Sequence, residues 1–470
     1  MAKPGRQRGI APLAAQRTPS RRAGLFAAVA VLLAVAPLAG SRADPAPPIA
    51  IAAQSEVRGH ESRLTFTLQS CVPAEAYVLD SPARAIIDLP EVNFQIDPRE
   101  GLAAPESKPR RHARPKHDKA EPQPPPGAAA SGSAPAPGLL ASYRFGKLAP
   151  GKSRIVADLT GPAAIVSVSC GPAPGASELT LVLAPSSEVA FKAAARAGAE
   201  KQAQAAALDT TAPVQPAAPQ PSSASQKPVI VIDPGHGGVD TGALGRDHAI
   251  EKFVVLDFAK VLAAKLRAGD HYQVVLTRED DTFVPLGERV RIARRLNAAL
   301  FVSIHADALA SNGDEVQGAT VYTVSDRASD AEAARVADHE NKADSAAGEE
   351  TKEDKSDVND ILFELTRRET RAYSHVFARS LSEYFKVAAR LNKNPRRSAG
   401  FVVLKAPDVP SVLLELGYLS NPADAADLSS PVWREKAASQ TAKAIDSFFA
   451  QREPENSPAT PQVVGDPHRP

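Results

Sequence analysis

A regular alternation of buried strands and amphipathic helices between residues 227 and 450 is the feature that most constrains the fold. The run "PVIVID" is typical of a buried strand, and "EKFVVLDFAKVLAAKLRA" repeats its apolar residues at helical spacing. The pattern continues through "YQVVLTR", "PLGERVRIARRLNA", "ALFVSIHAD", "GATVYTV", a long helix, "FVVLKA", "SVLLELGYLS" and a closing helix. It predicts an α/β domain whose mostly parallel sheet is flanked by helices on both faces.

The N-terminal half has a different pattern. Residues 48–186 contain short β-rich runs separated by Gly, Pro and Ser, which predict a small all-β module resembling a sandwich. Its two halves are alike, with "RLTFTL", "AYVLD" and "RAIIDL" matched by "RIVADL", "AIVSVSC" and "ELTLVL". A Pro-rich stretch over 102–137 interrupts the module, and we expect it to be disordered. Its basic piece "KPRRHARPKHDK" is either a solvated loop, which we favour, or a contact for an anionic polymer.

The remaining segments look like a leader, a linker and a tail. Residues 1–43 have the basic, apolar and small-residue order of a cleavable signal peptide, which predicts export. The pair Arg21 and Arg22 before the apolar run leaves the twin-arginine route open beside the general one. Residues 187–226 read as an interdomain linker with a helical start, and 451–470 as a disordered tail.

Charge and cysteine content narrow the possible partners. The 55 basic and 54 acidic residues leave a formal net charge of +1, which gives no support for nucleic-acid binding. Cys71 and Cys170 either pair in an oxidising compartment or remain as two buried thiols. Neither cysteine has ligand-like spacing to a histidine, so the sequence disfavours a cysteine-based metal site.

Polar residues occupy strand ends of the α/β domain where packing alone would not place them. His236 follows the first strand, His305 ends the strand "FVSIH", and Glu415 lies inside "SVLLELGY". Glu251 begins the helix that follows the first strand. Taken singly, each has an ordinary explanation, such as a loop histidine or an acid favoured at a helix N-terminus. Together they suggest one site, because strand ends and the start of the next helix meet at one edge of such a sheet.

The types of donor favour zinc. Two imidazoles and one carboxylate, from His236, His305 and Glu251, form a three-ligand set that leaves a fourth position open. Burial of Glu415 among Val and Leu residues is expected to raise the pKa of its carboxyl group toward that of a general base. Glycines around His236 allow a tight corner and leave room for a substrate. We therefore expect one Zn²⁺ ion per chain.

These residues carry a resemblance to a known family. The motifs "VIVIDPGHGGVDTGALG", "EKFVVLDFAK", "LFVSIHADA" and "VPSVLLELGYLSNP" resemble those of the zinc-dependent N-acetylmuramoyl-L-alanine amidases of the periplasmic cell-division type, over 227–450. The β module, over 48–186, is similar to the AMIN domain that precedes such catalytic domains. The Pro-rich interruption is a departure from that pattern.

The resemblance implies hydrolysis of the amide between the lactyl group of N-acetylmuramic acid and L-alanine of the peptidoglycan stem, in the service of daughter-cell separation. It implies that His236, Glu251 and His305 are zinc ligands. It also implies that Glu415 is the catalytic acid and base, which protonates the leaving amine. For Arg289, in the helix "PLGERVRIARRLN", we expect a salt bridge on the helix surface rather than a role in the site.

An insert over 325–356 interrupts the α/β domain before its long helix. Its ordinary interpretation is a solvated excursion. Its place and its "ENKAD" piece are, however, similar to the regulatory helix of the cell-division amidases, which covers the active site until a LytM-type activator displaces it. The resemblance then makes Glu340 the occupant of the fourth zinc position in a resting enzyme, with His339 as the alternative.

Two other functions share the same residues. One is a zinc peptidase that cuts a peptide bond of the stem, and the other is an inactive protein that binds or scaffolds the cell wall. The predicted partners are peptidoglycan, a LytM-type activator and, through the AMIN-like module, peptidoglycan or a component of the divisome. The activator's identity and the oligomeric state stay open at this point.

Overall fold

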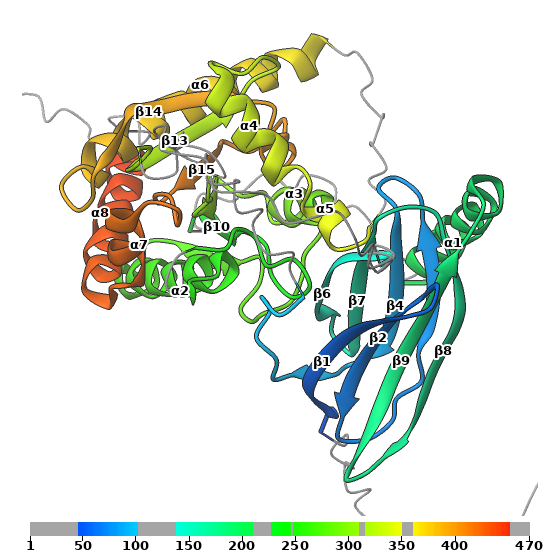
Figure 1. Ribbon diagram of the computed structural model, residues 1–470. Coiled ribbons are helices and arrows are strands. Elements are labelled where there is room, and N and C mark those ends of the chain that lie inside the picture. The colour runs from blue at the N-terminus through cyan, green and yellow to red at the C-terminus, as the bar shows by residue number, and fades with distance from the viewer. Residues whose placement is uncertain are drawn as a thin grey trace, which may run out of the picture. The chain divides into compact units, whose positions relative to one another are not determined.

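The computed structural model, shown in Figure 1, describes residues 46–101, 138–209, 227–245, 248–309, 315–349 and 361–451. The predicted signal peptide, the Pro-rich interruption and all of the predicted tail after residue 451 lie outside these ranges. Everything discussed below belongs to one unit of the chain, Pro47–Pro470. Among the helices within the described ranges, none is long and apolar enough to cross a membrane.

Residues 49–185 form two packed β-sheets, as the alternating runs predict (Figure 1). The strands are β1 (Ile49–Arg58), β2 (Glu61–Leu68), β3 (Glu75–Leu79), β4 (Arg84–Pro90), β5 (Asn93–Phe94), β6 (Leu140–Ala149), β7 (Lys152–Leu159), β8 (Ala163–Ala173) and β9 (Ala176–Pro185). Along β2 every second residue is buried, because successive side chains of a pleated strand point to opposite faces. Leu64 and Phe66 thereby reach the same core as Phe145 of the other sheet.

The internal similarity of the module is built into its sheet order. One sheet runs β5-β1-β2-β9-β8 and the other runs β3-β4-β7-β6. The order β3-β4-β7-β6 repeats the order β8-β9-β2-β1, and all neighbours in both sets are antiparallel. Apart from the short strand β5, each sheet therefore takes two strands from each half of the module, so neither half can form a sheet of this kind alone.

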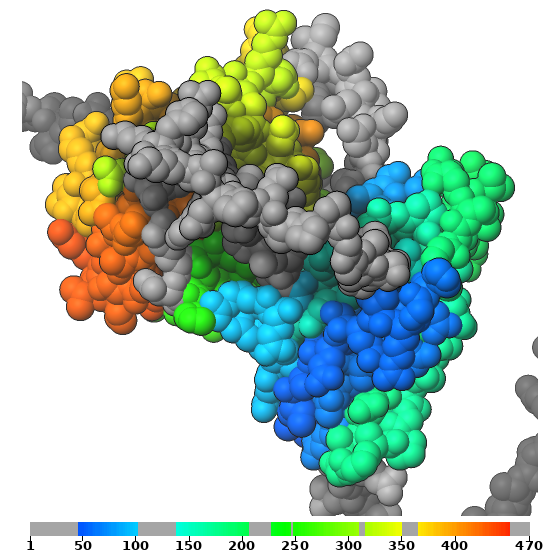
Figure 2. All heavy atoms as spheres, in the orientation of Figure 1, coloured from blue at the N-terminus to red at the C-terminus, as the bar shows by residue number. Residues whose placement is uncertain are grey.

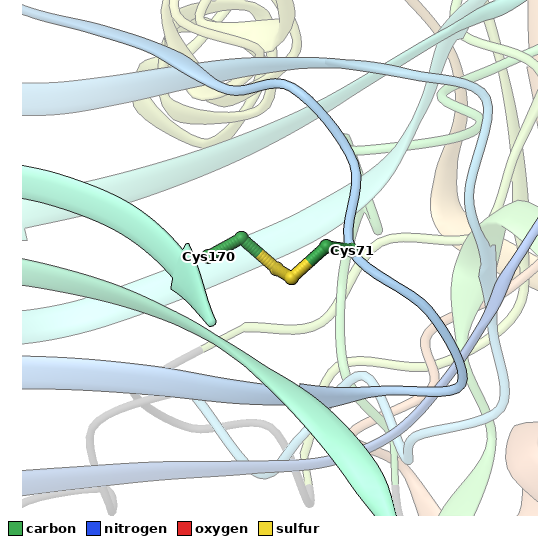
Figure 3. Close-up of a disulfide and its surroundings, with 2 residues drawn as sticks. All are labelled: Cys71 and Cys170. Carbon is green, nitrogen blue, oxygen red and sulfur yellow. A yellow bond between two sulfur atoms is a disulfide. The ribbon is translucent and has the colours of Figure 1, made fainter. Parts of the chain in front are cut away.

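A disulfide joins Cys71, just after β2, to Cys170 in β8 (Figure 3). The two Cα atoms are 5.6 Å apart across 99 residues of sequence. Of the two states that the sequence leaves open, the structure has the paired one. The bond ties the start of a loop to a strand near the edge of the larger sheet.

The range predicted as a linker with a helical start does begin with a helix, and this helix packs on the module. This helix, α1 (Glu188–Asp209), lies against β3. In the space-filling view its atoms lie directly against the strands of the module (Figure 2). Phe191 and Ala195 are buried in the core of the sandwich. The Ala-rich composition marked a helix, but the few apolar residues that dock it are too sparse to distinguish it from a linker.

The C-terminal domain contains a third sheet, with the order β11-β10-β12-β15-β13-β14. Its strands are β10 (Val229–Pro234), β11 (Gln273–Leu276), β12 (Leu300–His305), β13 (Ala319–Val324), β14 (Leu391–Ala399) and β15 (Ser411–Glu415). The first four strands in this order, β11, β10, β12 and β15, are parallel to one another. β13 is antiparallel to β15, and β14 is parallel to β13, so the sheet is mostly parallel as predicted.

Helices cover both faces of this sheet. Ile230 and Ile232 point to the face where α2 (Glu251–Gly269), α6 (Ile361–Phe385) and α8 (Pro431–Ala450) pack. Val231 points to the other face, where α3 (Leu286–Arg295) and α4 (Ala331–Glu340) pack. The short helices α5 (Ala343–Ala346) and α7 (Pro422–Ser429) complete the domain (Figure 1). The predicted α/β fold class is confirmed.

One predicted strand is wrong. The run "FVVLKA" forms a 3-10 turn, Val402–Leu404, and the neighbouring strand β14 is made by the more polar residues 391–399. Phe401, Val403 and Leu404 are buried in the core beside α3 and α4. A short apolar run signals burial, and burial alone does not separate a strand from a packed turn.

Candidate metal centre

The corner after β10 depends on left-handed backbone. His236, Gly237 and Gly238 have φ angles of 57°, 122° and 57°, in a region that is costly for residues with a side chain. Gly235 is required for a different reason, since a Cβ added there would lie 2.3 Å from the ring of His305. The corner therefore brings the first histidine into the sheet edge only with glycines at these positions.

Arg289 holds this corner from beneath. Its guanidinium donates hydrogen bonds to Asp233 Oδ1 at 2.7 Å, to Pro234 O at 2.8 Å and to His236 O at 2.8 Å. Burial raises the pKa of Asp233, but the Arg289 charge and two hydroxyl hydrogen bonds outweigh it and leave the pKa below its usual value. The prediction of a surface salt bridge for Arg289 is wrong. The residue lies on the stripe of α3 that is buried, three positions after Leu286.

Two further cations brace the corner. Arg278 Nη2 donates to Gly235 O at 2.7 Å, and Lys252 Nζ donates to Gly238 O at 2.7 Å. Burial lowers the pKa of Lys252, and the Asp281 carboxylate, 2.7 Å from its Nζ, offsets only part of this effect. Carbonyl oxygens that a tight turn leaves without helix or sheet partners are thus satisfied by buried side chains.

Glu251 is fully buried at the first position of α2. Its Oε2 accepts a hydrogen bond from Ala243 N at 2.8 Å, and its Oε1 accepts one from Ala306 N at 2.8 Å. These amides compensate part of the cost of burying a carboxylate and fix its orientation. Oε1 then lies 3.1 Å from His236 Nε2 and 3.2 Å from His305 Nδ1.

Four side chains converge at the sheet edge. Each of His236, Glu251, His305 and Glu340 offers one ligand atom, and these four atoms lie within 4.8 Å of one another. Glu340 Oε2 is 3.2 Å from His236 Nε2 and 2.8 Å from His305 Nδ1. We call these four residues the candidate metal centre. All three predicted zinc ligands and the predicted fourth occupant belong to it.

Asp240 orients the first histidine. Its Oδ2 lies 2.8 Å from His236 Nδ1, so the proton of a neutral imidazole is held on Nδ1. Nε2 is then left with its lone pair toward Glu251 and Glu340. A carboxylate behind a ligand histidine is a common feature of metal sites. The signal in the sequence is the acid four positions after His236 in "HGGVD", which the sequence analysis did not use.

The buried carboxylates of the candidate metal centre favour the presence of positive charge there. Burial lowers the pKa of His305, but the carboxylates of Glu340 and Glu251 outweigh this and raise it to about 10. Burial likewise lowers the pKa of His236, and Glu251, Asp240 and Glu340 together raise it well above its usual value. A centre that binds protons this firmly has an excess of buried negative charge, which a metal cation also neutralises.

The donor set fits zinc. His236 Nε2 and both carboxylate oxygens of Glu340 are buried without a hydrogen bond from the residues that the structure describes. Buried polar atoms without a hydrogen bond are rare in folded proteins. Here such atoms lie close together, as ligand atoms around a shared metal ion do. Imidazole nitrogen and carboxylate oxygen are both ordinary zinc ligands.

Glu415 lies beside the centre. The register of β12 and β15 pairs it with His305. Its Oε1 accepts a hydrogen bond from Asp307 N, and its buried Oε2 has no hydrogen-bond partner among the described residues. Burial, reinforced by the charges of Asp307, Glu251 and Glu340, raises its pKa well above the usual value. The carboxyl group can therefore hold a proton at a pH where an exposed glutamate has lost it.

Glu340, not His339, enters the centre from the insert. His339 Nδ1 lies 3.1 Å from Asp307 Oδ1, and the imidazole is about half exposed, with 48% of its side-chain surface accessible. The carboxylates of Asp307 and Glu340, at 3.1 and 3.4 Å from Nδ1, raise the pKa of His339 to about 11. The alternative in which His339 takes the fourth position is not supported by this geometry. His339 instead pairs with the residue whose backbone N–H binds Glu415.

Comparison with known proteins identifies the family. Residues 230–447 match the family model described as N-acetylmuramoyl-L-alanine amidase. The N-acetylmuramoyl-L-alanine amidase AmiA of Escherichia coli (strain K12) is 38% identical over 232 residues, which cover 49% of this chain and 79% of AmiA. The chain belongs to the N-acetylmuramoyl-L-alanine amidase family. The enzyme is therefore a hydrolase that cleaves the amide between N-acetylmuramic acid and L-alanine in peptidoglycan.

The chain is also similar to two further amidases. The N-acetylmuramoyl-L-alanine amidase AmiC of Escherichia coli O6:H1 (strain CFT073) is 34% identical over 245 residues, which are 52% of this chain and 58% of AmiC. The catalytic domain of CwlV, an amidase from Bacillus (Paenibacillus) polymyxa var. colistinus, is 29% identical with a TM-score of 0.35. The match covers 47% of this chain and 98% of that one.

The amidase contains site residues that the sequence analysis missed. They act through others: Asp240 on the imidazole of His236, and Arg278 and Lys252 on the carbonyls of the corner. Helical spacing offers a weak signal for Lys252, which directly follows Glu251 on a buried turn of α2. For Arg278 the strand pattern of "YQVVLTR" ends before the residue and gives no signal.

Proposed function

We propose that the amidase is zinc-dependent and that His236, Glu251 and His305 hold one zinc ion per chain. The observation that carries this proposal is the convergence of their donor atoms within 4.8 Å, together with the unpartnered Nε2 of His236. Zinc bound there would supply Lewis-acid chemistry and lower the pKa of a coordinated water. Chelator treatment should abolish sacculus hydrolysis, and added Zn²⁺ should restore it with about one equivalent bound. Full activity in metal-free enzyme would contradict the proposal.

Glu415 is the proton carrier of the reaction in this proposal. Its unpartnered Oε2 and raised pKa suit it to take a proton from the attacking water and to deliver it to the nitrogen of L-alanine as the amide breaks. The Asp307 N–H holds Oε1, so that Oε2 is the atom left for proton transfer. Family membership favours the lactyl amide over a peptide bond of the stem, and mass analysis of the fragments released from sacculi separates the two.

We further propose that Glu340 keeps the resting enzyme inactive. The carboxylate ends α4 at the position that water or substrate needs, 2.8 Å from His305 Nδ1. The neighbouring histidines hold its pKa well below the usual value despite burial, so it is charged and competes for the metal. A LytM-type activator that displaces α4 would free the position, and hydrolysis would begin at the site of division.

Replacement of Glu340 tests this autoinhibition. Glu340→Ala should raise the activator-free rate of sacculus hydrolysis at least tenfold, because the fourth position is no longer filled by the protein. Asp338→Ala is the matched control, since Asp338 is exposed on the same helix. A Glu340→Ala enzyme as slow as wild type, with zinc retained, would remove the inhibitory role from Glu340.

The cellular setting is the remaining part of the proposal. We propose that the chain is exported through its cleavable leader to the periplasm, by either route, and that the β module is an AMIN domain that binds peptidoglycan or a divisome component. The disulfide between Cys71 and Cys170 supports an oxidising compartment, and the two-sheet sandwich is compatible with an AMIN domain. A fluorescently tagged chain should concentrate at the septum of dividing cells, and a uniform periplasmic signal would contradict the role in daughter-cell separation.

A further inference from the structure

The insert does not end at the metal centre. Five residues beyond Glu340 its backbone reaches the β module, where Arg84 Nη1 donates to Ser345 O at 2.5 Å. Arg144 Nε donates to Ala346 O at 3.3 Å. We call residues 345–349 the insert tail. Its carbonyl groups are thus satisfied by arginines from two strands of the four-stranded sheet, β4 and β6.

Arg154 of β7 contacts three residues of the insert tail. Its side chain is only 4% exposed, and its Nη1 donates to Glu349 Oε1 at 2.7 Å. The same nitrogen lies 3.2 Å from Ala347 O and 3.3 Å from Gly348 O. The other side of the guanidinium is held by the Asp88 carboxylate, at 2.6 Å from Nε. A buried arginine that is already fixed on one side offers a preorganised donor to the tail on the other.

Strand register explains why these groups share one surface. Arg84 and Ile86 are two apart on β4, and they pair across to β7, where Val156 lies opposite Ile86. Residues with this spacing point to the same face, which is the outer face because Ile87 and Ile155 fill the core of the sandwich. Ile86 and Val156 are nevertheless fully buried.

The insert tail is part of what buries this outer face. Ala347 is fully buried in a cluster with Ile86 and Val156. Gly348 has a φ angle of 72°, and a Cβ added there would lie 2.6 Å from Ile86 Cδ1, so the backbone itself approaches the sheet. Gln202 of α1 adds a hydrogen bond from Nε2 to Gly348 O at 2.6 Å. Apolar contact, charge and hydrogen bonding all come from one face of the module.

We propose that the outer face of the sheet β3-β4-β7-β6 is a docking site for the insert tail, and that this docking holds α4 over the metal centre. The inference rests on the proposed autoinhibition by Glu340. The described part of the insert is then fixed near both of its ends: Arg397 of the catalytic domain pairs with Asp330 and Glu332, and Arg154 pairs with Glu349. Release of the tail from the module lowers the free energy needed to lift Glu340.

A charge reversal on the tail tests the docking in the zinc-loaded full chain. Glu349→Lys places a cation against Arg154, while the Asp88 partner of Arg154 stays in place. Glu349 is 28% exposed in a loop, so the module's own core is not altered. Amide hydrogen exchange of 331–346 should rise about tenfold, from the loss of a charge-assisted hydrogen bond, and the activator-free rate should rise with it. Asp338→Lys, an exposed reversal within α4, serves as the matched control.

The outcomes separate this proposal from the autoinhibition on which it rests. Unchanged exchange of 331–346 in Glu349→Lys would overturn the docking, whatever Glu340→Ala does. A rise in exchange without a rise in rate, in an enzyme that Glu340→Ala activates, would also overturn it, because docking would then not control α4. If Glu340→Ala does not activate, the autoinhibition itself fails, while exchange still reports whether the tail is docked. Gln202→Ala, which removes a second contact with the tail, should move exchange in the same direction.

Discussion

His236 and Glu340 approach within 3.2 Å of each other, but the structure holds them in very different ways. His236 stands on a corner whose carbonyl groups are bound by the buried side chains of Arg289, Arg278 and Lys252. Glu340 ends a ten-residue helix in an insert, next to the half-exposed His339. A side chain braced from the core is held firmly in place. A side chain at the end of a peripheral helix can leave without unfolding the sheet.

The two regions also differ in which groups become unpaired or exposed when their contacts are broken. Removal of a cation beneath the corner leaves Asp233 charged and buried, which is among the most destabilising changes a core can suffer. Loss of α4 from its seat exposes a few alanine and valine side chains and breaks polar contacts at its two ends. These are the pairing of Arg397 with Asp330 and Glu332, and the hydrogen bonds of Asn341 with Gly400 O and Val402 N. The corner is therefore coupled to global stability, and the insert to a local opening equilibrium.

The first prediction tests whether the candidate metal centre binds zinc independently of Glu415, the proposed proton carrier. Glu415→Gln should lower kcat for sacculus hydrolysis about 10³-fold, because the amide cannot exchange a proton with water or amine. Zinc content should equal that of wild type, since Glu415 lies beside the four converging donors. The Asp307 N–H still finds a side-chain oxygen in the variant, so folding is preserved. Equal activity would remove Glu415 from the mechanism, and lost zinc would move it into the centre.

The second prediction probes the brace beneath the corner. Arg289→Met should lower the free energy of unfolding by about 3 kcal/mol, because Asp233 and the Pro234 and His236 carbonyls lose their shared donor. Urea unfolding of the zinc-loaded enzyme gives the measurement. Arg291→Met, on the same helix but 64% exposed and paired with Glu288, should change stability by less than about 0.5 kcal/mol. Similar losses of unfolding free energy in both variants would mean that the contacts of Arg289 at the corner stabilise the fold no more than an exposed ion pair does.

The sequence predicted the residues at strand ends and helix starts better than the contacts between segments that are far apart in the chain. His236, Glu251, His305 and Glu415 could be found because each lies at a strand end or helix start, where the pattern of the neighbouring element marks its place. Their meeting at one edge follows from parallel strands, which is a property of the fold class. Even Glu340 could be named, but only through a resemblance, since no local pattern in "RVADHENKAD" indicates where the helix end points.

What the sequence could not predict are contacts between parts that are far apart in it. Arg289 was expected on the surface because a helix pattern does not reveal which strand end the helix covers. The contact between Arg154 and Glu349 joins residues that are 195 positions apart. The helix α1 was predicted as the start of a linker because its docking depends on the face of β3. "FVVLKA" reads as a strand until its place in the core beside α4 is known. Each of these errors concerns tertiary packing, which outweighs local propensity.

The smallest expected effect sharpens the distinction between a local and a global change. Asp330 caps α4 by accepting hydrogen bonds from Glu332 N and Ala333 N, and Ser430 caps α8 by accepting one from Trp433 N. Loss of a cap costs about 1 kcal/mol in either helix. In Asp330→Ala this cost falls on the closed insert, so the activator-free rate should rise about fivefold while the global free energy of unfolding stays within about 0.5 kcal/mol of wild type.

Ser430→Ala should do the opposite, because α8 packs on the sheet and opens only when the domain unfolds. Its unfolding free energy should fall and its activator-free rate should not change. Activity assays on sacculi and urea unfolding of both variants give the two readouts. If both caps alter global stability equally and neither alters the rate, α4 is an integral part of the core, and Glu340 is as permanent a member of the centre as His236. The two regions would then differ in sequence position only, and activation would have to come from a change in the sheet itself.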